Sequence, residues 1–392
     1  MALTRDRETN QRAATLDAAV KEAFAQGQYQ QGLQSLRALG ALLLDDAEVQ
    51  HRLAVVEEQI GDPQKALKAH QSCLRLAPNN PLAYLYTGYC LQQQGQLEEA
   101  VRVYSLGSDL DTHFLAPRPG DSPTDLRYAA ASRALRGHFT SLHRSAVGKD
   151  ITDRRIHNAI WTRTHDQPFE FEQDGQIPQL FYIPTLKPAP YFESEIWPWT
   201  KSLEQSAAVI LEEFSAANHV VNDQGRPYLS SDMALDDALA PLAGSLNWTA
   251  LDLFRDGQAN AQVGEHFPRT LAALSQVPLY GLNELPFEAF FSVLKPGQHI
   301  TPHYGLSNHS LTVHLPLITP QPGYLTVSGE ARPWEFGKLI AFDDSYLHEA
   351  HNQSDSERVV LIFSIWHPDL SESERLAIQR SFNARVQWLQ SR

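Results

Sequence analysis

The chain has 392 residues, of which 42% are hydrophobic, so it is long enough for two or three domains with proper cores. It carries 32 Lys and Arg against 46 Asp and Glu, and this formal net charge of −14 argues against a general nucleic-acid-binding protein, which would normally present a basic face. Two cysteines exclude a disulfide framework or a cysteine-based zinc cage. Without an apolar signal core or a run of about 18 apolar residues, we expect a soluble, cytoplasmic protein with no membrane span.

Three glycines near the beginning of the chain recur at a fixed interval. Gly27, Gly61 and Gly95 are each 34 residues apart (61 − 27 and 95 − 61), and residues 81–111 carry small residues where paired helices would cross. This period is typical of tetratricopeptide repeats, in which pairs of antiparallel helices stack into a solenoid. We expect about three repeats in residues 1–113, the first of them degenerate. Chance glycine spacing in an ordinary helical bundle is the alternative. A solenoid would offer a concave surface to a peptide or protein partner.

The character of the sequence changes after the repeats. Residues 114–124 are rich in proline and should end the regular stack, whereas residues 126–145 read as a helix that caps it. We therefore assign residues 114–168 to a linker and capping segment. Residues 201–217 show a further amphipathic helical pattern, and the tail at residues 371–392 is also expected to be helical.

Short apolar runs separated by turn residues dominate the chain from residue 286 onwards. Regularly spaced strands of this kind indicate an antiparallel β-sandwich or jelly roll. We therefore expect an α+β multidomain protein, in which an all-α solenoid precedes a double-stranded β-helix (a cupin-like jelly roll) within residues 169–392. The expected strands are residues 289–294, 311–317, 324–327, 338–342 and 359–365.

Two histidines stand out within the strand-rich part. His303 and His348 are 45 residues apart (348 − 303), each at the edge of an expected strand, and Arg358 follows the second. Neutral imidazoles near a cation suit a site that holds a metal together with an anionic cosubstrate. The commonest non-haem iron oxygenases have a carboxylate ligand two residues after the first histidine, but Gly305 occupies that position here. On residue chemistry alone, a surface or core role for both histidines stays open.

The phrases around these histidines form an ordered series. Residues 292–308 contain the first histidine, residues 342–349 read Phe-Asp-Asp-Ser-Tyr-Leu-His-Glu, and residues 366–370 read Trp-His-Pro-Asp-Leu. Over roughly residues 180–375 the series resembles the aspartyl/asparaginyl β-hydroxylase family of iron(II)- and 2-oxoglutarate-dependent oxygenases, whose larger members also carry tetratricopeptide repeats in front. Members of this family lack the carboxylate ligand and have glycine in its place, so Gly305 agrees with the resemblance.

The resemblance implies a role for each residue of the site. His303 and His348 would bind iron(II), and Gly305 would mark the vacant ligand position that water fills. Arg358 would bind the distal carboxylate of 2-oxoglutarate, a role that suits a planar guanidinium. No side chain would act as catalytic acid or base, because iron, the cosubstrate and dioxygen carry the chemistry. Ser292, His314 and Trp248 would complete the cosubstrate pocket, Asp344 would support a ligand histidine, and His299, His309, His351 and His367 are treated as non-ligands.

Some of these residues could instead have a purely structural role. Trp248 could be an ordinary core residue, and Asp343 and Asp344 could form a turn rather than orient a ligand histidine. The chain also departs from the animal members, whose arginines hold the acidic side chain of the substrate, because residues 309–313 contain serine and threonine instead. An aspartyl substrate is therefore in doubt unless another arginine, such as Arg255, substitutes.

The leading hypothesis is an iron(II)- and 2-oxoglutarate-dependent hydroxylase that releases succinate and carbon dioxide. It would hydroxylate an unactivated C–H bond, such as one at the β-carbon of Asp or Asn. The substrate would be a peptide, a protein or an amino-acid-like molecule, which the repeat surface could help to hold. The alternative is a repeat scaffold whose oxygenase-like domain no longer turns over, although retention of both histidines and Arg358 argues against it. A hydroxylase of lipid acyl chains ranks lowest, because we find no hydrophobic membrane-associating segment.

Overall fold

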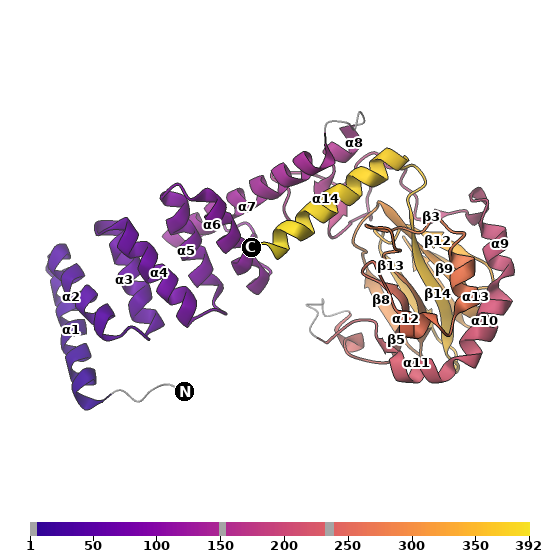
Figure 1. The fold of residues 1–392 in the computed structure, drawn as a ribbon, viewed down its shortest axis with the longest axis horizontal. Helices are drawn as coiled ribbons and strands as arrows, with labels where there is room; N and C mark the ends of the chain where they lie inside the picture. The colour runs from indigo at the N-terminus through magenta and orange to yellow at the C-terminus, as the bar shows by residue number, and fades with distance from the viewer. Residues whose placement is uncertain (1–5, 149–153, 232–238) are drawn as a thin grey trace. The chain divides into compact units, whose positions relative to one another are not determined.

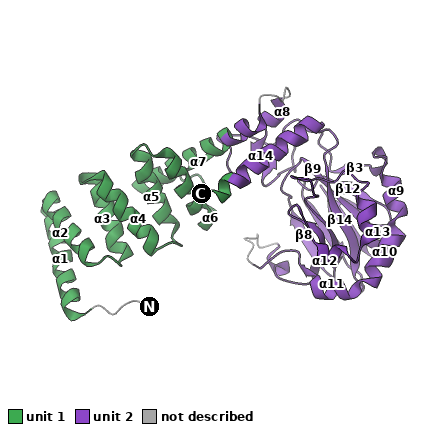
Figure 2. Ribbon diagram, viewed as in Figure 1, with its two compact units in different colours: residues 1–141, 388–392 green, residues 142–387 purple. Residues whose placement is uncertain are grey.

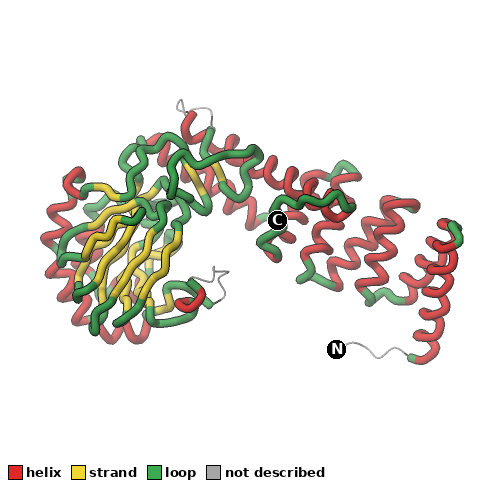
Figure 3. The backbone as a smooth tube through the Cα atoms, turned by 180° about the vertical axis from the view of Figure 1, so that it is seen from behind, coloured by secondary structure: helices red, strands yellow, loops and turns green. Residues whose placement is uncertain are grey.

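Helices form the first part of the chain, and antiparallel strands dominate the last part (Figures 1 and 3). The computed structural model describes residues 6–148, 154–231 and 239–392. The order agrees with the expected α+β organisation, in which a helical region precedes a domain built on sheets.

The chain divides into two compact units (Figure 2). Residues 1–141 and 388–392 form the first unit, and residues 142–387 form the second. Both limits fall inside long helices, α7 (Pro123–Val147) and α14 (Glu372–Gln390), rather than in irregular linkers.

Antiparallel helix pairs make up most of the first unit, as the 34-residue period predicts. The second helices of successive pairs begin at Tyr29, Pro63 and Leu97, so the interval between starts is again 34 residues (63 − 29 and 97 − 63). The first pair departs from the pattern because its first helix has 19 residues, against 14 and 13 in the next two pairs. The pairs are α1 (Arg7–Ala25) with α2 (Tyr29–Leu42), α3 (Ala47–Ile60) with α4 (Pro63–Leu76), and α5 (Pro81–Gln93) with α6 (Leu97–Leu110).

The three glycines that mark the period have two different structural roles. Gly27 and Gly95 adopt left-handed backbone conformations, with φ of 71° and 77°, in the turn between the helices of a pair. Glycine adopts this conformation without steric cost. Gly61 instead leaves room for Glu57, whose carboxylate accepts two hydrogen bonds from Arg37 at 2.6 and 2.9 Å. At the middle position, glycine is therefore needed because the Glu57 side chain lies close to the backbone, and not because of a left-handed turn.

Two antiparallel sheets form the centre of the second unit. The order of the larger sheet is β3 (Tyr191–Phe192), β12 (Ile340–Phe342), β9 (Ser310–Ile318), β14 (Arg358–Trp366), β7 (Ala289–Leu294), β5 (Trp248–Arg255) and β4 (Arg226–Pro227), with β6 (Gln258–Ala259) paired to β5. The order of the smaller sheet is β11 (Glu330–Pro333), β10 (Gly323–Val327), β13 (His348–Asn352) and β8 (His299–His303).

The larger sheet is covered on both faces, and β7 shows how its residues divide. Phe291 and Val293 pack with helices on the outer face, whereas Phe290 and Leu294 join an apolar core that includes residues of the smaller sheet. Alternate residues of a strand point to opposite faces, so the two sheets face each other across the second core. The outer helices are α9 (Thr200–Gln205), α10 (Ala207–Ala216) and α13 (Pro268–Leu274), which Figure 1 shows beside β9 and β14.

Most of the expected strands are present as β7, β9, β10 and β14, while the strand expected from residue 338 begins at Ile340. Strand β5 was not predicted, because residues 248–251 are all buried and lack the alternation of a half-exposed strand. The helix expected at residues 201–217 is divided at Ser206 into α9 and α10. The domain limits expected at residues 113 and 168 stay a prediction.

The remaining elements are short. Within the described ranges, no helix has both the length and the apolar character needed to cross a bilayer. The short elements are α8 (Arg154–His157), α11 (Asn218–Gln224), α12 (Ala261–Gly264), the 3-10 turns at Ser194–Ile196 and Ala240–Leu242, and a strand pair of β1 (Ile160–Trp161) and β2 (Phe181–Tyr182).

Replacing Gly88 with alanine is expected to destabilise the helix pairs of the first unit. A Cβ atom at Gly88, on α5, would lie 2.5 Å from the ring of Tyr104, which is fully buried on α6. Overpacking of this kind should lower the free energy of unfolding by about 1–3 kcal/mol. Urea unfolding of the full chain, followed by circular dichroism, measures the change.

Gly137 offers a matched control within the same unit. It lies in α7, and a Cβ atom there would meet nothing within 4 Å. Since alanine is the better helix former, Gly137→Ala should leave the stability unchanged or raise it by about 0.5–1 kcal/mol. Equal unfolding midpoints for the two variants would contradict the packing argument at Gly88.

Candidate functional site

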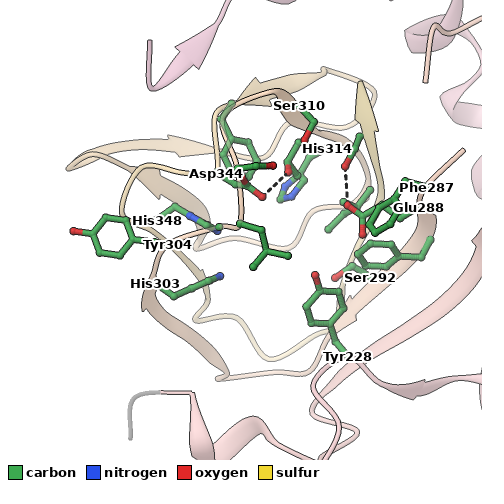
Figure 4. A pocket seen from close by; sticks show the side chains of 18 of the residues that line it. Tyr228, Phe287, Glu288, Ser292, His303, Tyr304, Ser310, His314, Asp344 and His348 are labelled. Atoms are coloured by element: carbon green, nitrogen blue, oxygen red, sulfur yellow. Dashed lines mark hydrogen bonds between the residues drawn. The ribbon is translucent and has the colours of Figure 1, made fainter. Parts of the chain in front are cut away.

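The two histidines singled out in the sequence lie side by side in the smaller sheet. His303 on β8 and His348 on β13 are direct partners across the strand pair. Their ring centroids are 4.1 Å apart, and both rings line a cavity of about 510 Å³ between the sheets. Figure 4 shows both side chains entering this cavity from the same side, opposite Ser292 and Glu288. The fold therefore brings together two imidazoles that are far apart in the sequence.

A β-bulge turns His303 toward the cavity. His348 pairs with His303 and Ala350 pairs with Ile300, so three steps along β8 match two steps along β13. Ile300 and Ala350 are both buried in the core between the sheets. Strict alternation from Ile300 would direct His303 to the outer face, and the extra residue in β8 reverses this.

Both rings are held in the tautomer that a metal ligand requires. His303 Nδ1 donates to the carbonyl oxygen of Thr301 at 2.8 Å, and His348 Nδ1 donates to that of Tyr346 at 2.9 Å. The lone pair of each neutral ring is then on Nε2. Burial, with a smaller contribution from His303, lowers the pKa of His348 to about 3, so this ring is neutral at physiological pH. The pair fits a divalent transition metal such as iron(II).

Arg358 is a buried cation at the same cavity. Its side chain is 1% exposed, and among the described residues its Nε has no hydrogen-bond partner and its guanidinium no ion pair. The group donates weakly to Ser292 Oγ, at 3.5 Å, and lies 4.8 Å from the ring centre of Trp334. Burial lowers the pKa of Arg358 to about 9, which still leaves it charged at neutral pH. A buried charge without a counter-ion is costly, so the arrangement indicates a site for an anion.

Ser292 is oriented to bind the same anion. Its Oγ accepts a hydrogen bond from Trp248 Nε1 at 3.0 Å and the longer one from Arg358. Because both neighbours are donors, the hydroxyl proton of Ser292 is directed to another acceptor. Trp248 is buried and stacks on Tyr228, with ring centroids 4.1 Å apart. Trp248 therefore belongs to the apolar core and also orients Ser292, while its role in a cosubstrate pocket stays a prediction.

His314 completes this side of the cavity. Trp334 Nε1 donates to His314 Nδ1 at 3.3 Å, so the proton of the neutral ring is on Nε2. Burial, followed by the charges of Arg358 and His348, lowers the pKa of His314 well below its usual value. His314 is therefore a neutral donor. Trp334, which was given no role from the sequence, contacts both His314 and Arg358 and is central to this part of the site.

Position 305 requires glycine because the Asp344 side chain lies too close to leave room for a Cβ atom. The Gly305 amide donates to the Asp344 carbonyl at 2.6 Å, and a Cβ atom on Gly305 would lie 2.3 Å from Asp344 Cγ. No side chain fits at position 305 unless Asp344 moves. The Asp344 carboxyl accepts a hydrogen bond from Thr312 Oγ1 at 3.2 Å. Burial, followed by the nearby Asp343 and Glu288 carboxyls, raises its pKa to about 8, so it is largely protonated at pH 7.

Asp343 has a different role from its neighbour. Its carboxylate accepts hydrogen bonds from the backbone amide and the hydroxyl of Ser345, at 2.9 and 2.5 Å, and from Gln176 Nε2 at 2.8 Å. These bonds fix the turn before β13, so the turn-forming alternative applies to Asp343. Asp344 instead lines the cavity.

The substrate side of the cavity is poor in positive charge. Among the described lining residues, Arg358 is the only Arg or Lys, and Ser310 and Thr312 occupy the positions expected to lack arginine. The structure does not bring Arg255 to the cavity, because that side chain is half exposed and pairs with Asp256 at 3.4 Å. The expectation that Arg255 could replace the missing arginines is therefore wrong.

A half-buried acid that was not predicted from the sequence lies on the same side. Glu288 Oε1 accepts a hydrogen bond from Ser364 Oγ at 2.7 Å, and burial raises the pKa of its carboxyl. Figure 4 shows Glu288 opposite the histidine pair. No motif surrounds Glu288 in the sequence, so its place at the cavity follows only from the pairing of β7 and β14.

The remaining histidines differ in their surroundings. His367 Nε2 donates to the carbonyl oxygen of Lys187 at 3.2 Å. His309 lines the cavity and is fully surrounded by protein, which lowers its pKa to about 3. His299 and His351 lie on the outer face of the smaller sheet.

Comparisons with known proteins agree with the residues gathered here. Residues 204–368 match the family described as aspartyl/asparaginyl beta-hydroxylase, and residues 59–113 match a tetratricopeptide repeat family. The human aspartyl/asparaginyl beta-hydroxylase is 25% identical over 369 residues, which are 90% of this chain and 42% of the relative. Aspartate beta-hydroxylase domain-containing protein 2 of Xenopus tropicalis is 31% identical over 232 residues, 58% of this chain and 60% of the relative.

A relative that is named for a different type of substrate also matches. The ornithine lipid ester-linked acyl 2-hydroxylase of Rhizobium tropici is 30% identical over 182 residues, 46% of this chain and 61% of the relative. This chain spans less than half the length of the human relative. For residues 204–368, with a tetratricopeptide repeat match in front of them, the comparisons therefore agree with the aspartyl/asparaginyl β-hydroxylase family that the sequence resembles.

Proposed function

We propose that this protein is an iron(II)- and 2-oxoglutarate-dependent dioxygenase that hydroxylates an unactivated C–H bond in a peptide, protein or amino-acid-like substrate. The observation that carries the proposal is the buried Arg358 guanidinium, which forms no ion pair with the described residues and lines the same cavity as the His303 and His348 pair. A metal-chelating dicarboxylate would satisfy both features at once. We interpret the two facing antiparallel sheets as a double-stranded β-helix, the jelly roll expected from the sequence.

The residues present fit both groups. His303 and His348 would hold iron(II) through Nε2, and the glycine at position 305 would leave the remaining positions to the cosubstrate and water. Arg358 and the Ser292 hydroxyl would bind the distal carboxylate of 2-oxoglutarate, because a guanidinium and a directed O–H together suit a carboxylate. The Nε2 proton of His314 would be a further donor to the bound anion.

When bound, iron and 2-oxoglutarate would supply the oxidation, in which dioxygen, 2-oxoglutarate and the C–H substrate become succinate, carbon dioxide and the hydroxylated product. The chain's own residues bind and orient. The His348 ring stays unprotonated, Arg358 would fix the position of the cosubstrate, and apolar cavity walls limit the access of water. No side chain has to move a proton.

The charges that line the cavity bear on the substrate. Arg358 would be committed to the cosubstrate, while Asp344 and Glu288 add carboxyl groups rather than cations. An aspartyl side chain would meet no compensating charge, so within the class that the family name describes, a neutral asparaginyl residue suits the cavity better. The repeat surface would hold the substrate chain or a partner protein.

Hydroxylation of an acyl chain is the second candidate. One part of the cavity is lined by apolar side chains that would accept a hydrocarbon, and the Rhizobium tropici relative is named for acyl 2-hydroxylation. Mass spectrometry of peptides and of lipids, each incubated with iron(II), 2-oxoglutarate and the protein, separates the two candidates by which class gains one oxygen atom. The apolar residues are Leu180, Leu282, Leu306, Phe382 and Val386.

Loss of one proposed metal ligand should abolish turnover. We expect the full chain to convert 2-oxoglutarate to succinate in an iron-dependent way, and His303→Ala to lower the rate at least about 100-fold, since even residues that only support a ligand cost 10–100-fold. His219→Ala, at an exposed histidine on α11, is the control and should keep the wild-type rate. Succinate is measured by NMR. Wild-type turnover by His303→Ala would refute the proposed metal site.

Replacing Arg358 with lysine should weaken binding of the cosubstrate. Lysine keeps the charge but loses the planar fork, which costs roughly 1.5–3 kcal/mol of hydrogen bonding to a charged partner. We therefore expect KM for 2-oxoglutarate to rise by about 10–100-fold, with a smaller effect on kcat. Steady-state kinetics measure both constants.

The matched control is Arg332→Lys. Arg332 lies on β11, where it is partly exposed and its guanidinium sits 4.0 Å from the ring centre of Tyr191. This variant should keep KM for 2-oxoglutarate within a factor of two or so. If Arg358→Lys left KM unchanged, the carboxylate would not be bound at Arg358.

A further inference from the structure

The outer face of the smaller sheet carries a second group of potential metal ligands. His299 on β8 lies directly opposite His351 on β13, and Glu349 precedes His351 by two residues on the same strand. Residues two apart on a strand point to the same face. The intervening Ala350, like the neighbouring Ile300, is buried between the sheets, so His299 and His351 point away from the cavity, and Glu349, which also borders the cavity, turns its carboxylate toward them.

The three side chains converge on one point. Glu349 Oε2 is 2.8 Å from His299 Nε2 and 3.2 Å from His351 Nε2, and the two rings stack with centroids 3.6 Å apart. All three ligand atoms lie within 4.8 Å of one another. In a tetrahedral zinc site with ligand bonds of about 2.0–2.1 Å, neighbouring ligand atoms are about 3.3–3.4 Å apart. Admitting the ion would lengthen the separation of Glu349 from His299 by about 0.5 Å and turn the two rings out of their stack, so that the lone pair of each Nε2 points at the ion.

The surroundings favour a bound ion over isolated surface side chains. The three side chains are 18–36% exposed, so an ion can reach them and water can complete its coordination. Tyr324 on β10 stacks on the His351 ring, with centroids 4.9 Å apart, and holds its orientation. The donor set of two imidazoles and one carboxylate is one that zinc accepts.

We propose that His299, Glu349 and His351 bind one divalent transition-metal ion of the zinc type. This site shares no ligand with the cavity pair, because His348 and Glu349 are consecutive residues whose side chains point to opposite faces of β13. A bound ion would cross-link β8 and β13 next to the bulge that turns His303 toward the cavity. It would stabilise the strand pair that carries both cavity histidines.

The test counts zinc ions in a chain from which the cavity pair has been removed. Tag-free protein with His303→Ala and His348→Ala is dialysed against zinc chloride, and bound zinc is measured by elemental analysis. We expect one equivalent to remain. Adding His351→Ala should remove it, and adding Glu349→Gln should weaken binding at least tenfold in calorimetry. Retention of zinc after His351→Ala, or no zinc in the starting variant, would overturn the proposal.

His266→Ala is the matched control. His266 is also partly exposed, lies 3.6 Å from Glu265 and has its ring 5.5 Å from that of His219, yet these residues do not form a group of three converging ligands. This variant should keep the full zinc equivalent, and the same loss as with His351→Ala would overturn the assignment. If the starting variant does not fold by circular dichroism, the unsubstituted chain is used. There, His351→Ala should lower the zinc count by one, and an unchanged count contradicts the site.

Discussion

The second unit is organised around a buried positive charge that the described residues do not neutralise. Keeping the Arg358 guanidinium away from water costs several kcal/mol unless an anion or a hydrogen-bond network compensates. Within residues 6–148, 154–231 and 239–392, the guanidinium meets only a long hydrogen bond to Ser292 and the face of Trp334. The free folded state therefore carries an electrostatic cost that a bound carboxylate would offset. In the proposed function, binding energy at this end of the cavity would position the rest of the anion against the histidine pair.

The geometry around the histidines depends on two local departures from regular structure. The bulge in β8 directs His303 inward, and the glycine at position 305 leaves room for the Asp344 carboxyl. A third protein ligand at position 305 would need the space that Asp344 fills. The bulge lies between the His303–His348 pair and the Ile300–Ala350 pair. His303 and His348 are on the inner face of the sheet, which would carry the oxidation, and His299 and His351 meet on the outer face. A single strand pair thus supports both proposed metal positions.

The sequence predicted those features that leave a local pattern. A 34-residue period predicted the helix pairs, and the phrases around His303 and His348 located two residues that the fold brings together. Features that depend on contacts between distant strands could not be predicted. Strand β5 lacks alternation because both faces are buried, Glu288 has no motif, and Trp334 gains its role only by touching His314 and Arg358. The substitute arginine suggested from the sequence, Arg255, is half exposed outside the cavity.

The central claim is that one cavity holds a metal at the histidine pair and a dicarboxylate at Arg358. Anaerobic calorimetry with 2-oxoglutarate and with 2-oxobutyrate, which lacks the distal carboxylate, tests it in the presence and absence of manganese(II) as a redox-stable substitute for iron(II). We predict that manganese tightens binding of 2-oxoglutarate at least tenfold, and that 2-oxobutyrate binds at least tenfold more weakly than 2-oxoglutarate under the same conditions. Equal affinities for the two acids, or binding that does not respond to the metal, would contradict it.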